Sequence, residues 1–228
     1  MSASFLIQGG REKNLIFGIE KSGLIKENNM RKTILFVILQ QYADWEAAYI
    51  SSAISMLGQD NYEIKTVSLS KDYVQSIGGF KVLPDYDVAS VPNDYEALIL
   101  IGGMTWRSEN TQPIKVLAKD CFQRGKLLCG ICDASAFLGT AGILNHVVHT
   151  SNDLNDLKQW AETNYTGEEN YIVKQAVCNK NVITANGTAP LEFAKEILLA
   201  LHVTDEKTIA DWYNFHKLGV YIAPMPKM

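Results

Sequence analysis

The side chain in this sequence that is best suited to chemistry is Cys132, which lies within the stretch Gly-Ile-Cys-Asp-Ala of residues 130–134. An apolar strand-like run leads into this cysteine, small residues flank it, and a helical pattern follows at once. This is the spacing of a nucleophile elbow with cysteine in the serine position. The partial positive charge of a helix N-terminus lowers the pKa of a thiol placed there. The alternative is a small buried cysteine at a strand end, and the pattern alone leaves both open.

A second candidate is Glu46, near the start of a helical pattern for which Asp44 is a suitable N-cap. Glu46 shares one helical face with Ile50, Ala53 and Leu57, which directs its carboxyl group toward the core. Burial would raise the pKa of that group and allow it to share a proton with a nearby thiolate or to act as an acid and base. The alternative is an exposed carboxylate that stabilises the helix dipole from solvent.

A pair of glycines, Gly102 and Gly103, directly follows the apolar run of residues 97–101. Glycines at a strand end let backbone N–H groups approach a ligand or a developing oxyanion, although a plain turn explains them equally well. Two tryptophans, Trp45 and Trp106, lie close to these candidates in the sequence and could wall a pocket. Aromatic residues at a sheet edge also commonly serve only to pack the core.

The remaining cysteines suggest one rival, because Cys129 and Cys132 have the C-x-x-C spacing of a redox dithiol. Cys129 lies inside the strand-like run, so we expect its side chain to point into the layer beneath the sheet and not toward Cys132. We interpret Cys121 and Cys178 as core or partly buried thiols. No cluster of cysteine and histidine has the spacing of a zinc site, and we predict no metal and no cofactor.

The elements that must position these residues alternate between strand-like and helical periods. The strand-like runs are 33–39, 62–67, 97–101, 126–131 and 182–184, and the helical patterns are 44–57, 112–124, 134–142 and 190–201. Nearly continuous apolar strands alternating with helices predict an α/β sandwich with a mainly parallel sheet. In such sheets, ligands bind beyond the carboxyl ends of the strands, where Cys132 and the glycine pair lie.

The chain between residues 30 and 203 contains no linker and no repeat, which predicts one domain. Within it, the glycine pair of segment 76–84 predicts a short hairpin. Residues 1–29 are expected to form an N-terminal extension or arm, with a short edge strand at 15–17 as the alternative. Residues 204–228 are expected to form a helical and then extended tail.

Composition excludes several classes of protein. The 228 residues are 47% hydrophobic and 20% charged, with a formal charge of −4, which is typical of a soluble globular protein without the basic surface of a nucleic-acid binder. The longest strongly apolar stretch, residues 33–39, is too short to cross a membrane, and the N-terminus lacks the order of a secretory signal. We therefore expect a cytoplasmic protein without nucleic-acid or membrane partners.

Taken together, residues 31–203 resemble the ThiJ/PfpI superfamily, which includes intracellular protease I-like proteins and the parkinsonism-associated deglycase, within the class I glutamine amidotransferase-like fold. The matching segments, in order, are the first strand with Asp44-Trp45-Glu46, then 76–85, 95–103, 130–132, 138–144 and 182–194. The resemblance implies a flavodoxin-like three-layer sandwich, a homodimer and no cofactor. It also implies that Cys132 is the elbow nucleophile, that Glu46 hydrogen bonds to it, and that Gly103 and the backbone of Asp133 line an anion-binding notch.

Departures from the family pattern limit what can be carried over. Protease-like members commonly have histidine directly after the cysteine, whereas this chain has Asp133, whose charge disfavours a neighbouring thiolate. Glutamine hydrolysis is rejected, because neither His202 nor His216 lies in a late His–Glu pair. A base could come from His149, although the register of this segment leaves His146, Ser151 and Asn152 open. A histidine there could equally be a surface or capping residue.

Two functions from different classes follow. The first is a cysteine enzyme that acts on small electrophiles such as 2-oxoaldehydes, through a hemithioacetal on Cys132 with Glu46 relaying a proton, or a related hydrolase or amidase. The second is a stress or redox sensor without turnover, in which Cys132 oxidises to a sulfenic or sulfinic acid stabilised by Glu46. An enzyme needs a base within reach of the thiol, whereas a sensor needs only an exposed thiol of low pKa.

Overall fold

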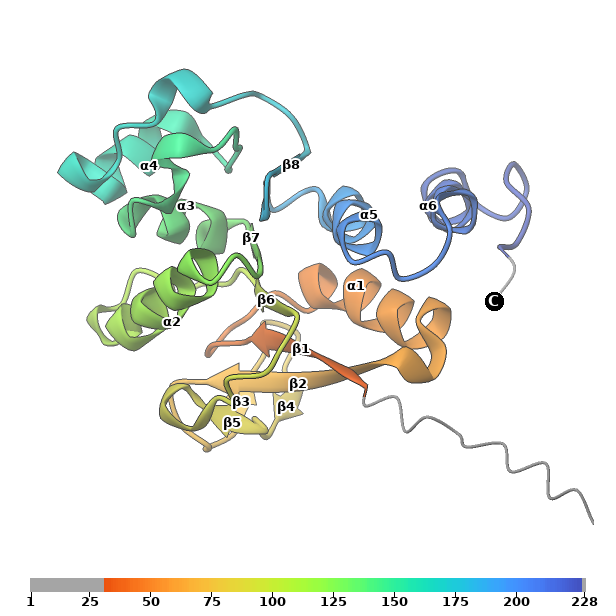
Figure 1. The fold of residues 1–228 in the computed structure, drawn as a ribbon, viewed down its shortest axis with the longest axis horizontal. Coiled ribbons are helices and arrows are strands. Elements are labelled where there is room, and N and C mark those ends of the chain that lie inside the picture. The colour runs from red at the N-terminus through yellow and green to blue at the C-terminus, as the bar shows by residue number, and fades with distance from the viewer. Residues whose placement is uncertain (1–30, 227–228) are drawn as a thin grey trace, which may run out of the picture.

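The computed structural model describes residues 31–226, and the predicted N-terminal extension therefore lies outside the described residues. Seven strands form one sheet in the order β5-β2-β1-β6-β7-β9-β8 (Figure 1). In the order of the sheet, their bounds are Tyr86–Asp87, Tyr62–Ser68, Lys32–Val37, Ala97–Leu100, Leu127–Ile131, Val182–Ala185 and Ala176–Asn179. Every neighbouring pair is parallel except β8 with β9. The mainly parallel sheet predicted from the sequence is confirmed.

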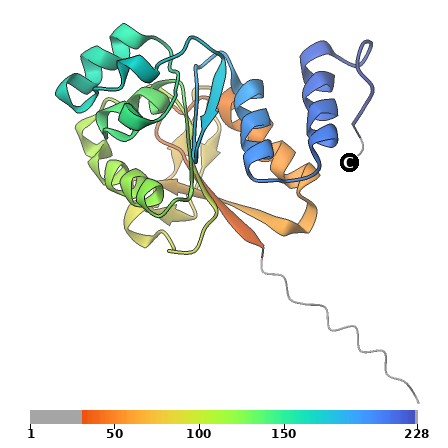
Figure 2. The ribbon, with the colours of Figure 1, turned by 45° about the horizontal axis from the view of Figure 1, so that its top comes forward.

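Helices lie on both sides of this sheet, and the described residues contain six α-helices. Helices α1 to α6 comprise Asp44–Leu57, Gln112–Gln123, Asp133–Thr140, Leu154–Ala161, Pro190–Ala200 and Glu206–Leu218. Alternate residues of β1 enter different cores: Ile34 and Phe36 pack with residues of α1, α5 and α6, whereas Leu35 and Val37 pack with residues of α2, α3 and α4. Figure 2 shows the two helical layers on either side of the sheet. The fold is therefore the predicted three-layer α/β sandwich.

The start of α1 differs from the prediction in one detail. The helix begins at Asp44 itself, and Ala43 occupies the N-cap position without a side-chain cap. The carboxylate of Asp44 instead accepts the N–H of Gly78 at 2.7 Å. Gly78 lies in the turn between β3 (Val74–Gln75) and β4 (Lys81–Val82), which form the predicted antiparallel hairpin. Asp44 thus joins α1 to this hairpin and does not cap the helix.

The C-terminal helix belongs to the domain core. Ile209 and Trp212 of α6 are buried in the same apolar cluster as α1 and α5. The ring of Trp212 also meets the ring of Tyr49 from α1 edge to face, at 6.3 Å between centroids. The predicted helical tail is therefore packed onto one face of the sandwich. Within residues 31–226, no helix is both long enough and apolar enough to cross a bilayer.

Candidate functional site

Cys132 lies in the sharp turn between β7 and α3, with φ 59° and ψ −132°. This strained backbone conformation is typical of a nucleophile elbow, which exposes its side chain at the end of a strand. Hydrogen bonds fix the turn on both sides: the Cys132 N–H donates to the carbonyl of Ala185 at 3.0 Å, and the Ser135 hydroxyl donates to the Cys132 carbonyl at 2.6 Å. The sequence pattern thus correctly predicted the strand, the turn and the helix around a half-buried thiol.

The carboxyl group of Glu46 lies beside this thiol. Glu46 is fully buried on the inner face of α1, and neither of its carboxyl oxygens has a partner at hydrogen-bonding geometry. The start of α1 is tied to the end of β6 by a hydrogen bond from the Ala43 N–H to the Gly102 carbonyl at 3.0 Å. The alternative of an exposed, dipole-stabilising Glu46 is therefore wrong.

Glycines form the walls around the thiol and the carboxyl group. A methyl group on Gly102 would come within 2.3 Å of Glu46 Oε2 and 2.6 Å of Cys132 Cβ. A methyl group on Gly187 would come within 2.9 Å of Cys132 Sγ. Gly103 lies close to the backbone of Gln41. A methyl group on Gly103 would come within 2.5 Å of the Gln41 carbonyl oxygen. Glycine at positions 102 and 187 lets two segments approach Cys132 closely, and glycine at position 103 lets the first of these segments pack against Gln41.

The protons of Glu46 and Cys132 are coupled. Burial raises the pKa of Glu46 to about 7, and contacts with Cys132 and the N–H of Gly102 offset only part of this rise. Burial and the charge of Glu46 raise the pKa of Cys132 to about 11. These values describe the pair, which loses one proton near neutral pH and the other in strong alkali. The lowered thiol pKa predicted from the helix N-terminus alone is therefore outweighed by burial and by the carboxyl group.

The single negative charge that the pair holds at neutral pH is better placed on sulfur than on oxygen. Cys132 Sγ receives the side-chain amide of Asn152 at 3.4 Å and also the N–H of Asp133, whereas Glu46 faces only the thiol and the N–H of Gly102, neither at good hydrogen-bonding geometry. A buried anion without donors is costly, and each donor stabilises the charged form. With the carboxyl group protonated, its contribution to the raised pKa of the thiol also disappears. The donors on sulfur therefore favour the form of the pair in which Glu46 is protonated and Cys132 is a thiolate, whereas burial of the thiol opposes that form.

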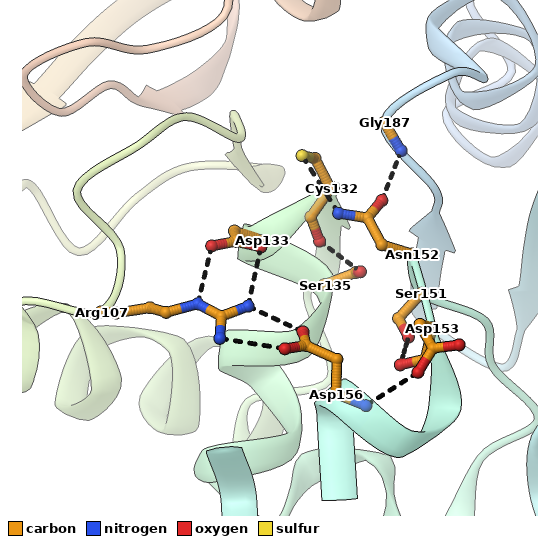
Figure 3. A network of polar contacts seen from close by, with 9 residues as sticks. All are labelled: Arg107, Cys132, Asp133, Ser135, Ser151, Asn152, Asp153, Asp156 and Gly187. Carbon is orange, nitrogen blue, oxygen red and sulfur yellow. Dashed lines mark hydrogen bonds and ion pairs between the residues drawn. The ribbon is translucent and has the colours of Figure 1, made fainter. Parts of the chain in front are cut away.

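Asn152, one of the alternatives left open beside His149, occupies the place next to the thiol. Its side-chain oxygen accepts the N–H of Gly187 at 2.8 Å, which turns the amide nitrogen toward Cys132 (Figure 3). The prediction of a catalytic role for His149 is corrected: its ring nitrogens bond to the Val147 carbonyl at 2.8 Å and the Tyr165 hydroxyl at 2.7 Å. Burial lowers the pKa of His149. The imidazole is a neutral, buried structural group without contact to the thiol.

Asp133 has a side-chain partner that the sequence did not reveal. Its carboxylate receives two hydrogen bonds from Arg107, at 3.0 and 3.2 Å, and so does not stand uncompensated beside the thiol. Arg107 lies in the loop between β6 and α2, 26 residues before Asp133 in the chain. Neither its position nor its neighbours form a recognisable motif.

The two tryptophans have different surroundings. Trp106 is fully buried, and its indole N–H donates to the Ile101 carbonyl at 2.8 Å. The prediction that Trp106 lines the binding site is therefore wrong, because the indole packs into the core against Phe137 at 4.8 Å between ring centroids. Trp45 is 48% exposed, and its indole N–H lies 3.4 Å from the Gly187 carbonyl, at the rim of the site.

The other cysteines lie apart from this chemistry. Cys129 is fully buried within β7, as expected from its place in the strand, and burial raises its pKa well above the ordinary value. Cys121 is also buried, whereas Cys178 is exposed, which corrects the interpretation of that residue as a core or partly buried thiol. In the described part of the chain, no group of three or more His, Cys, Asp or Glu side chains could hold a metal ion.

The close approach at Gly187 leads to a first prediction. Gly187→Ala is expected to lower the alkylation rate of Cys132 about 10- to 100-fold, because the new methyl group must displace the sulfur atom. The measurement is iodoacetamide modification followed by peptide mass spectrometry. Thr188→Ala, in the same loop, should leave the rate unchanged, since its hydroxyl bonds only to Asn186. A wild-type rate in Gly187→Ala would contradict this placement of Cys132.

Two curated proteins of Bacillus subtilis are similar to this chain over most of its length. The uncharacterized protease YdeA is 37% identical over 190 residues, which cover 83% of this chain and 93% of the relative. The uncharacterized protease YoaZ is 35% identical over 193 residues, covering 82% of this chain and 91% of the relative. Each match therefore extends over most of both chains.

Two solved structures are similar to this chain in both sequence and fold. A DJ-1 superfamily protein from Agrobacterium tumefaciens is 34% identical with a TM-score of 0.75, covering 82% of this chain and 98% of the other. A thiJ/pfpI family protein from Bacillus anthracis is 31% identical with a TM-score of 0.78, covering 82% and 91%. The model of the DJ-1/PfpI family matches residues 32–200, which contain the elbow, the buried carboxyl group and the glycine walls. The chain therefore belongs to the DJ-1/PfpI family.

Proposed function

We propose that this protein is a cofactor-independent cysteine enzyme that acts on small carbonyl electrophiles, with Cys132 as nucleophile and Glu46 as proton relay. The observation that carries the proposal is the buried pair itself: a carboxyl group with a pKa of about 7 lies against a thiol on an elbow. An acid or base works best when its pKa is close to the working pH. Gly102 and Gly187 bring the backbone of two further segments close to this pair.

A 2-oxoaldehyde such as methylglyoxal suits this pair. The thiolate attacks the aldehyde carbon, and Glu46 gives its proton to the resulting oxyanion, which forms a hemithioacetal. The ionised Glu46 then takes the proton from the former aldehyde carbon and returns it to the neighbouring carbon, while the hydroxyl proton moves from the first oxygen to the second, which leaves a thioester of lactate. Water hydrolyses the thioester, so that methylglyoxal and water give lactate and a proton without net oxidation. The N–H groups of Gly103 and Asp133 are proposed to face the oxyanion.

Peptide hydrolysis, which the names of the Bacillus relatives suggest, is less well supported by the site. A cysteine peptidase requires a base that activates the thiol and protonates the leaving amine. None of the four histidines of this chain hydrogen bonds to Cys132 in the part that the structure describes. The related hydrolysis of small amides or esters with Glu46 as the acid stays a variant of the same proposal.

Oxidation of Cys132 to a sulfenic or sulfinic acid is the second candidate function. It is favoured by the half-buried position of the thiol and by two donors, from Asn152 and from the Asp133 backbone, that could hold a sulfinate oxygen. Such a protein would need no turnover. The two candidate functions therefore differ in one measurable quantity. An enzyme consumes many molecules of substrate per molecule of protein, whereas a redox sensor does not.

The test is the formation of lactate from methylglyoxal by the purified protein, without glutathione and with a metal chelator present. We expect many molecules of lactate per molecule of protein, because the pair supplies both the nucleophile and the proton relay. Absence of turnover would overturn the proposal. If peroxide then converts Cys132 rapidly to the sulfinic acid, as read by intact mass, the redox function takes its place.

A further inference from the structure

Arg107 joins two carboxylates that belong to different helices. Its guanidinium donates to Asp133 at 3.0 and 3.2 Å and to Asp156 at 2.7 and 3.0 Å (Figure 3). The same group lies over the ring of Trp160 in α4, at 4.8 Å from the ring centre. Paired, charge-assisted bonds of this kind fix direction as well as distance. Arg107 therefore locks the start of α3 to the first turn of α4.

The two segments that Arg107 joins carry the thiol and its amide donor. Asp133 is the residue after Cys132, and Asp156 lies four residues after Asn152. Between them, Asp153 caps α4 by accepting the N–H of Asp156 at 2.9 Å. The position of the first turn of α4 thus determines where the Asn152 side chain emerges, and the position of Asp133 follows that of Cys132.

Asn152 needs this support because its own contacts are few. Besides its 3.4 Å contact with Cys132 Sγ, its side chain is held by the Gly187 N–H. Apolar packing of Leu157 and Trp160 holds α4 against α3, but such packing is non-directional and does not by itself aim the Asn152 amide at sulfur. A shift of about 1 Å would be enough to weaken the amide contact to sulfur.

Arg107 also acts on the charge around the thiol. Asp133 and Glu46 are the two carboxyl groups that face Cys132, and the charge of Asp133 contributes to raising the pKa of both partners in the pair. The guanidinium balances that charge. Four of its five N–H groups are used in the bonds to Asp133 and Asp156, so a substrate anion finds little of its donor capacity free.

We propose that Arg107 is a positioning residue that holds the first turn of α4 against the elbow and thereby keeps the Asn152 amide on Cys132. The inference rests on the proposed function only in taking Cys132 as the reactive group. Lysine could supply the charge at this position but not the planar fork that reaches both carboxylates.

The experiment measures the alkylation rate of Cys132 by iodoacetamide between pH 5 and 10, with peptide mass spectrometry to separate it from the exposed Cys178. We expect Arg107→Ala and Asn152→Ala each to slow the reaction at pH 7 about 5- to 20-fold and to move the profile toward alkaline pH. If Arg107 acts through Asn152, the double variant is no slower than the slower single variant. Arg107→Lys should resemble Arg107→Ala.

Lys158→Ala is the matched control. Lys158 also lies in α4 and forms an ion pair, with Glu168 at 2.6 Å, but has no bond to Asp133. Its rate should equal that of the wild type. Asp156→Asn weakens the bonds from Arg107 to α4 and leaves those to Asp133 in place. This variant should show the same slower alkylation of Cys132, and it serves as the test if Arg107→Ala fails to fold.

Two outcomes would overturn the inference. Effects that multiply in the double variant would show that Arg107 and Asn152 act independently, and a wild-type profile in Asp156→Asn would show that the link to α4 is without consequence. The alkylation rate requires no substrate. If the protein forms no lactate but its variants show the expected alkylation rates of Cys132, the proposed function is contradicted and the role of Arg107 is not.

Discussion

In the Cys132→Ser variant, we expect lactate formation from methylglyoxal to fall to the rate measured without protein. A serine hydroxyl does not ionise near neutral pH, and only an adjacent base would make it a nucleophile. Glu46 cannot take that role well, because its proton is already retained up to a pH of about 7. The measurement is the initial rate of lactate formation at saturating methylglyoxal, with circular dichroism and thermal unfolding to confirm the fold.

Cys178→Ser is the control for this variant. Cys178 is an exposed free thiol in β8, so its reaction with aldehydes could imitate consumption of substrate. We expect full activity in Cys178→Ser. Lactate formation by Cys132→Ser at more than about one tenth of the wild-type rate would show that sulfur at position 132 is not the attacking atom.

Glu46→Gln is expected to lower turnover about 100-fold or more while leaving the thiol in place. Glutamine fills the same space but can neither give a proton to the hemithioacetal oxygen nor take one from carbon. The expected change therefore falls mainly on kcat. Glu192→Gln is the matched control, since Glu192 lies in α5 and pairs with Lys217 at 2.7 Å, on another helix.

The same variant has a second readout in the pH dependence of Cys132 alkylation. The wild-type pair is expected to titrate in two steps, near pH 7 and near pH 11. Removing the carboxyl group leaves one titrating group, and because the charge of Glu46 raises the pKa of Cys132, the step near 11 should vanish. Identical profiles for wild type and Glu46→Gln would exclude the coupling on which the mechanism depends.

The sequence predicted the architecture well because the signals were local. The apolar runs that became β1, β6 and β7 are continuous, as strands covered on both faces must be. Three elements were not predicted, the strands β5 and β8 and the helix α4. The two strands are short and lie at the edges of the sheet, but α4 had a detectable signal, because Asp153 is a cap and Leu154, Leu157 and Ala161 have helical spacing.

The site could be predicted only where it depended on local pattern. The elbow at Cys132 is such a pattern, and the helical face of Glu46 is another. Whether His149 or Asn152 reaches the thiol depends on how the loop between α3 and α4 folds back toward Cys132. The placement of Arg107 depends on Asp133 and Asp156, which lie 26 and 49 residues further along the chain. The homodimer, the cytoplasmic location and the absence of a cofactor are not determined by contacts within one chain and stay predictions.

The buried carboxyl group of Glu46 also has a consequence for the stability of the fold. An unfolded chain would release this proton near the ordinary pKa of 4.5, and the folded chain near 7. Between these values the folded state binds more protons than the unfolded state, so the free energy of unfolding falls as the pH rises through this range. The protein is thus less stable in the pH range in which its thiol becomes most reactive. The residue that prepares the site for reaction also limits how stable the folded chain can be.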